Sequence, residues 1–232
     1  MPGFVSHTVM AHDVYKKLKN KNVNLDYMIT YSLGGDLSKY AKCRYDSHHK
    51  DMDKFIYEMA RYIKENNLMD DKNIMGVLYG HICHYVMDNT IHPLVRKIDK
   101  TCVNTKHNHT LIEVYYDNYL VIDVTKKNYL KKGILKTKSD QKINKMINSI
   151  YKEVYDTAKV ANYYQFNLLL YKILKNIYII FGDKLTNKVI GLNRFLKHNS
   201  DKLLNQEFDE MYELSVTLAY EYIKNVINYI KN

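Results

Sequence analysis

The sequence predicts an all-α protein, a single-domain multi-helix bundle with a metal cleft formed by its N-terminal half. Only 2 prolines and 8 glycines occur among 232 residues, and Leu, Lys and Met are plentiful, which favours helix. Apolar residues recur three and four positions apart in one segment after another, as in helices with one buried face. The length suffices for one large domain, expected to span residues 1–232.

The N-terminal half is expected to contain helices separated by polar connections. The second of them ends at Gly34-Gly35, so Asp36 is expected on a loop. Pro93 disfavours a helical conformation of the residue before it, so the fourth helix is expected to end near His92, where its partial negative charge favours a cation. The expected spans are 5–19, 24–34, 51–66, 72–92 and 109–121.

The C-terminal half begins with a Lys-rich connection over residues 122–138. Breaks are expected at Gly182-Asp183 and in the polar stretch 199–205. This part carries no chemical motif, and its role stays open between covering the cleft, forming a dimer face and binding a partner. The expected helices span 140–158, 160–181, 185–198 and 207–230.

The stretch Gly80–Pro93 carries the chemistry at the centre of the chain. His84 and Asp88 are four residues apart and therefore share one face of a helix. With His92 they form a donor set that zinc accepts, and burying a carboxylate beside two imidazoles is costly without a cation. His81 is an alternative donor, whereas Cys83 is expected to pack away from that face.

A second cluster follows at His109 and Glu113, again four residues apart. Two readings stay open, because Thr110-x-x-Glu113 is also the pattern of a helix capping box. The readings are compatible if Thr110 caps while Glu113 turns inward. His107 is a weaker alternative to His109.

The order His84-x-x-x-Asp88-x-x-x-His92-Pro93 and then His109-x-x-x-Glu113 resembles the bacterial zinc-dependent phospholipase C family. Three upstream features of that family also have counterparts, and the motif-bearing part covers residues 4–121. The choice between His48 and His49 stays open, and Asp36 could instead close the turn after the glycines. The upstream counterparts are His7, the Gly-Gly-Asp that ends at Asp36, and His48.

The resemblance implies two zinc ions, or three, and a zinc-bound water that attacks a phosphoester. Asp36 would also be the catalytic base. A third ion would be held by the N-terminal residue, His7 and Asp88. This chain begins Met1-Pro2 and has no Trp, unlike the secreted enzymes, and its interval from Asp88 to His92 is shorter than theirs. The first ion would be bound by Asp36, His48, His84 and Asp88, and the second by His92, His109 and Glu113.

The expected function is a zinc-dependent phosphodiester hydrolase that acts on a phospholipid or related phosphoester. The alternatives are a zinc-dependent nuclease or phosphatase on the same fold, and a non-catalytic, metal-stabilised helical protein. The net charge of +10 suits anionic partners, including peripheral contact with an anionic membrane or nucleic acid.

The cysteine count and the ends of the sequence bear on the compartment. Three cysteines without a Cys-x-x-Cys motif make a disulfide framework improbable. The first residues lack the pattern of a signal peptide, and the most apolar stretch, 166–181, is too short and too charged to span a membrane. We therefore expect a cytoplasmic protein without a transmembrane segment.

Overall fold

The computed structural model is all-helical within the part of the chain that it describes, residues 3–18, 22–38, 51–103, 107–123, 125–127 and 140–232. Of residues 174–175 and 177–186 only the backbone is described. Within this described part, no helix is both long and apolar enough to cross a membrane. The elements are α1 (Phe4–Lys17), α2 (Leu25–Tyr31), η1 (Gly34–Ser38), α4 (Met52–Glu65), α5 (Lys72–Asp99), α6 (Asn108–Leu120), α8 (Gln141–Tyr155), α9 (Val160–Ile190), α10 (Leu192–Asn199), η2 (Ser200–Lys202) and α11 (Asn205–Lys231).

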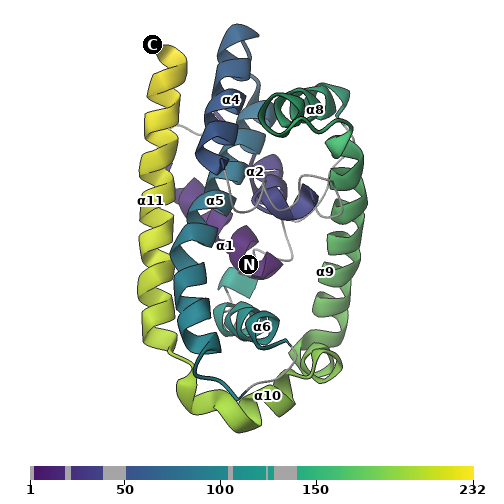
Figure 1. The fold of residues 1–232 in the computed structure, drawn as a ribbon, viewed down its shortest axis with the longest axis vertical. Coiled ribbons are helices and arrows are strands. Elements are labelled where there is room, and N and C mark those ends of the chain that lie inside the picture. Colours follow the sequence, from purple (N-terminus) through teal and green to yellow (C-terminus); the bar gives the residue numbers. More distant parts are fainter. Residues whose placement is uncertain (1–2, 19–21, 39–50, 104–106, 124, 128–139) are drawn as a thin grey trace.

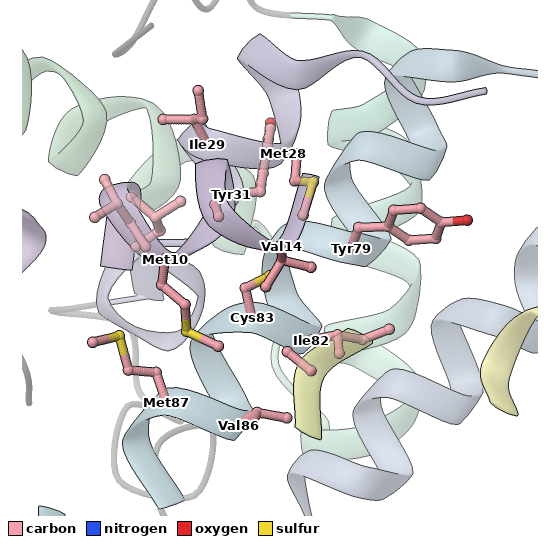
Figure 2. Close-up of a cluster of buried hydrophobic side chains, with 14 of the residues drawn as sticks. Met10, Val14, Met28, Ile29, Tyr31, Tyr79, Ile82, Cys83, Val86 and Met87 are labelled. Atoms are coloured by element: carbon pink, nitrogen blue, oxygen red, sulfur yellow. The ribbon is translucent and has the colours of Figure 1, made fainter. Parts of the chain in front are cut away.

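Helix α5 is the centre of the bundle (Figure 1). It contacts α1, α2, α4, α6 and α11. Helix α9 runs along the side of the molecule opposite α11, where it contacts η1. The core is continuous from α1 through α2 to α5, with Met10, Met28 and Cys83 all fully buried (Figure 2). Burial of these side chains supplies the main stabilising term, at roughly 1.5–3 kcal/mol for each large apolar side chain.

Two glycines on α5 allow α2 to approach closely. A Cβ atom on Gly76 would lie 2.7 Å from the carbonyl oxygen of Asn24, and one on Gly80 would lie 2.6 Å from the carbonyl oxygen of Met28. Gly34 then turns the chain with φ +33°, and a side chain there would meet the ring of His84. The backbone of α2 and η1 therefore covers the face of α5 from which His84 projects.

Helix α5 does not end at His92, contrary to the expectation from Pro93. It continues to Asp99 with Pro93 inside it, so the partial charge of a helix end does not act at His92. The proline removes one intrahelical hydrogen bond. Leu94, Val95 and Ile98 are all buried, and their packing outweighs that loss.

The break expected at Gly182-Asp183 is also wrong. Helix α9 runs through both residues, and the chain breaks at Gly191, where φ is +80°. A glycine inside a helix costs only about 1 kcal/mol relative to alanine, so it need not end one. Gly191 adopts the left-handed conformation that commonly terminates a helix.

Candidate metal centre

The first donor group joins three elements at the middle of α5. His7 comes from α1, Asp36 from η1 and His84 from α5, and all three are almost fully buried. One ligand atom from each lies within 4.8 Å of the other two. Two imidazoles and a carboxylate are one of the donor sets that zinc takes in enzymes.

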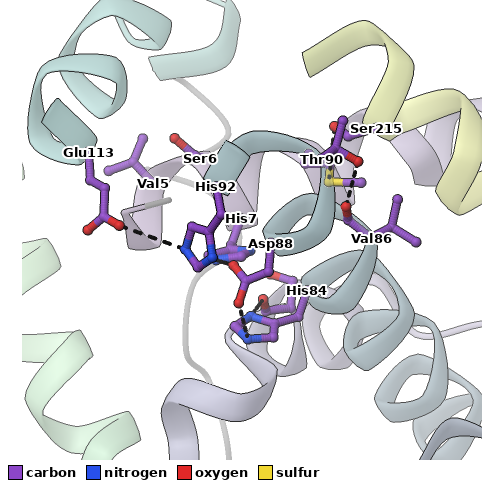
Figure 3. Close-up of polar contacts among 12 residues, drawn as sticks. Val5, Ser6, His7, His84, Val86, Asp88, Thr90, His92, Glu113 and Ser215 are labelled. Carbon is purple, nitrogen blue, oxygen red and sulfur yellow. Dashed lines mark hydrogen bonds and ion pairs between the residues drawn. The ribbon is translucent and has the colours of Figure 1, made fainter. Parts of the chain in front are cut away.

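Asp88 lies against this group one turn after His84 on α5 (Figure 3). Its Oδ1 is 3.4 Å from Nε2 of His7, and its Oδ2 is 3.4 Å from Nε2 of His84. Burial alone would raise the pKa of the Asp88 carboxyl, but the neighbouring His84 and His7 outweigh it and hold this pKa well below its usual range. Asp88 is therefore a carboxylate that can serve as a fourth donor.

The orientation of His84 is fixed by the backbone of the segment that covers it. Its Nδ1 lies 3.1 Å from the carbonyl oxygen of Ser32, so Nδ1 carries the proton and donates it. Its Nε2 is then left on the side of Asp88. The ring of His7 stacks on the ring of His84 with centroids 4.4 Å apart. A hydrogen bond from the distal nitrogen to a carbonyl is the usual support of a metal-binding histidine.

The second donor group consists of His92, His109 and Glu113, whose ligand atoms also lie within 4.8 Å of one another. Glu113 Oε1 is 2.8 Å from Nε2 of His109 and 4.0 Å from Nε2 of His92. Burial lowers the pKa of His92 to about 3 and raises the pKa of Glu113 well above its usual range. The side chain of His109 is 39% exposed, so this group is open to solvent.

Both groups fit a cation better than they fit an empty core. Within the described residues, Nδ1 of His7 and Nε2 of His92 are buried and make no hydrogen bond. Buried polar atoms in proteins nearly always have a partner, and a zinc ion would give His92 one. Among the residues that the structure describes, the second group offers three protein donors, the number that catalytic zinc sites have beside an open position.

Several alternatives from the sequence are settled by position. His81 faces the core, where Nδ1 lies 2.9 Å from the carbonyl oxygen of Val77 and Nε2 lies 3.0 Å from the hydroxyl of Tyr164, so it is not a site donor. Cys83 is buried in packing, as expected. His48 and His49 lie outside the described residues.

The start of α6 corrects the capping-box reading. The helix begins at Asn108 with exposed His107 as its N-cap residue, so Thr110 already lies inside the first turn. The Glu113 side chain is directed to His109 and His92 instead of to a helix start. His109, and not the alternative His107, is therefore the histidine that contacts Glu113.

One set of contacts near the first group, made by Asp117, was not predicted from the sequence. Asp117 on α6 accepts hydrogen bonds from the Ser6 N–H at 2.8 Å and from the Ser6 hydroxyl at 2.5 Å. It also accepts one from the Val5 N–H at 3.3 Å. The available signal was that Asp117 follows Glu113 by four residues and so shares its face of α6.

Comparison with protein families decides the relationship. The family model described as zinc dependent phospholipase C matches residues 6–164. The chain belongs to the zinc dependent phospholipase C family. The match includes every candidate donor from His7 to Glu113, and it continues through α8 into α9, beyond the motif-bearing part that ends at residue 121. Searches of curated proteins and of solved structures found no match.

Proposed function

We propose that this protein is a zinc-dependent phosphoester hydrolase of the phospholipase C type, which acts on a phospholipid or a related phosphoester. Membership in the family supports zinc dependence and a phospholipid as the substrate. The two His and carboxylate groups in the N-terminal half supply donors that could hold the metal.

The observation that carries the proposal is that one helix serves both donor groups. Helix α5 gives His84 and Asp88 to the first group and His92, one turn later, to the second. One turn is a rise of about 6 Å for four residues, so the two groups are neighbours along the helix. In this assignment His7, Asp36, His84 and Asp88 would hold one zinc ion, and His92, His109 and Glu113 would hold another.

Zinc ions in such sites stabilise charge on phosphoryl oxygens and lower the pKa of water. The protein's own contribution is to orient the donors and to control access. The first group is closed by η1 and α1, whereas the exposed edge of His109 leaves the second group accessible. We therefore place substrate entry on the His109 side. Asp36, a buried carboxylate next to two imidazoles, is the proposed acceptor of the proton released on hydrolysis.

A second candidate is a zinc-dependent nuclease or phosphatase on the same scaffold. The net charge of +10 favours polyanionic substrates as well as anionic lipid. A purely structural, metal-stabilised protein is less well supported, because the second group has three donors among the described residues, as catalytic zinc sites do.

The decisive experiment measures zinc per chain and then hydrolysis with and without chelator. Substrates are phosphatidylcholine vesicles, a chromogenic phosphodiester and single-stranded DNA. We expect bound zinc and chelator-sensitive cleavage of the lipid. Cleavage of DNA without cleavage of lipid would transfer the assignment to a nuclease, and bound zinc without any turnover would indicate a structural site.

A further inference from the structure

The start of helix α1 is anchored by a residue far away in the sequence. The first N–H groups of any helix lack partners within that helix, and a side chain at the N-cap position usually supplies one. The N-cap residue of α1 is Gly3, which makes no side-chain cap. Asp117 of α6 takes over this role through its bonds to the N–H groups of Val5 and Ser6 and to the Ser6 hydroxyl.

The fit between α1 and Asp117 is close. A Cβ atom on Gly3 would overlap the carboxylate of Asp117, so only glycine allows this approach. Asp117 is buried, and a negative group at a helix N-terminus is also favoured by the helix dipole. The first turn of α1 is therefore held in one position relative to α6.

The residue that follows this anchor is the donor His7. Its ring is fully buried, and its Nδ1 makes no hydrogen bond within the part of the chain that the structure describes. The ring of His7 meets Asp88 and stacks on His84, and both of these belong to α5. These two contacts with α5 orient the ring, whereas the place from which the side chain starts is set by the first turn of α1, which Asp117 holds.

Helix α6 thereby connects the two donor groups. Glu113 belongs to the second group, and Asp117, one turn later, anchors the helix that delivers His7 to the first. We propose that Asp117 is a positioning residue for zinc binding at the first group, acting through Val5 and Ser6 on His7. The inference rests on the assignment of the first group as a zinc site, but it does not depend on which phosphoester is hydrolysed.

The test is the zinc affinity of Asp117→Ala, measured by competition with a chelator of known affinity and compared with the melting temperature. The matched control is Asp140→Ala. Asp140 caps α8 through the N–H groups of Lys142 and Ile143, so its loss removes a helix cap on an element that supplies no donor. We expect Asp117→Ala to weaken zinc binding at the first group by about tenfold, the lower end of the effect of losing a partner that is hydrogen-bonded to a metal ligand itself. Asp140→Ala should leave zinc affinity within about twofold while lowering stability by about 1 kcal/mol.

Two milder variants keep the test informative if Asp117→Ala does not fold. Asp117→Asn retains one acceptor oxygen, and Ser6→Ala removes only the hydroxyl bond. We expect both to fold and to show intermediate losses of zinc affinity. Folded variants with wild-type zinc affinity would overturn the inference and leave the hydrolase proposal intact. A wild-type protein that binds zinc but hydrolyses none of the substrates would overturn the hydrolase proposal and leave the inference about Asp117 intact. A wild-type protein that binds no zinc would overturn both proposals.

Discussion

At the scale of single residues, Asp88 is the most informative position, because its two oxygens face two different imidazoles. Asp88→Asn should lower zinc per chain and hydrolysis together, since an amide is a poorer zinc donor and carries no charge. The loss of activity should exceed the roughly 10–100-fold that follows removal of an outer-shell partner. Metal analysis and the lipid assay on the same preparations provide the readout.

Asp99→Asn on the same helix is the control for that substitution, since Asp99 belongs to neither donor group. It should keep both zinc and activity. Unchanged zinc in folded Asp88→Asn would show that Asp88 only orients the histidines.

His81 predicts a pH dependence of stability that is independent of zinc. Burial lowers its pKa from 6.5 to about 4, so the folded protein keeps it neutral. Between pH 6.5 and 4 the unfolded chain binds a proton that the folded chain does not, and stability is lost as the pH falls. The full effect of this one group is about 3 kcal/mol.

Urea unfolding in chelator at pH 7 and pH 4.5 tests this expectation. His81→Phe should be less stable at pH 7, because Tyr164 loses a hydrogen-bond partner. Its further loss on acidification should nevertheless be smaller than that of the wild type by about 2 kcal/mol. Equal losses in both proteins would exclude His81 as the titrating group.

At the scale of elements, the contact between α2 and α5 depends on glycine. Gly80→Ala should lower the free energy of unfolding by about 1–3 kcal/mol, because its Cβ would press on the backbone of α2 at Met28. Since the same backbone covers His84, zinc affinity should fall as well. Gly191→Asn is the control, because nothing lies within 4 Å of that position and Asn tolerates its positive φ. Similar losses in both variants would contradict the packing argument.

Pro93 differs from Gly80 in that it destabilises the helix that contains it, because it removes one hydrogen bond from α5. Pro93→Ala restores an N–H group within α5 and should raise stability by about 1–3 kcal/mol in thermal or urea unfolding. Because Pro93 follows His92 directly, zinc binding should be measured alongside. Unchanged stability would mean that the surrounding helices already compensate for the missing bond.

At the scale of the whole molecule, zinc should contribute to folding stability. The first group holds buried polar side chains from three elements, and an ion bound only by the folded state stabilises it by about 2.7 kcal/mol at a hundred times Kd. Chelator should therefore lower the melting temperature, and added zinc should restore it. Asp88→Asn should respond less to both. A melting temperature that chelator does not change in zinc-loaded protein would argue against a buried ion.

The helices that the sequence predicted well are those decided by local pattern. Helix α4 spans Met52–Glu65 against an expected 51–66, because its apolar stripe is clear and polar residues flank it. The errors occurred where packing between distant segments decides, as in the continuation of α5 past Pro93 and of α9 past Gly182. Neither outcome can be derived from the neighbouring residues alone.

The residues of the candidate site also fall into those that local spacing predicts and those that depend on contacts between distant segments. The pairs His84 with Asp88 and His109 with Glu113 follow from helical spacing, and the structure places each pair in contact. The approach of His7 to His84 and Asp88 was predicted only from the family resemblance. Asp117 was missed because its partner Ser6 lies 111 residues away in the sequence. That these residues bind zinc stays a prediction until metal is measured.

The unbroken course of α5 has a consequence for how the chain tolerates changes in length. Each residue added to a helix turns everything beyond it by about 100° and lifts it by 1.5 Å. One insertion between Asp88 and His92 would swing His92 away from Glu113 while His84 stayed in place. The number of residues between Asp88 and His92 thus fixes the position of the second donor group relative to the first. The same insertion in the polar turn after Asn199, where no donor follows, would leave the relative position of the two donor groups unchanged.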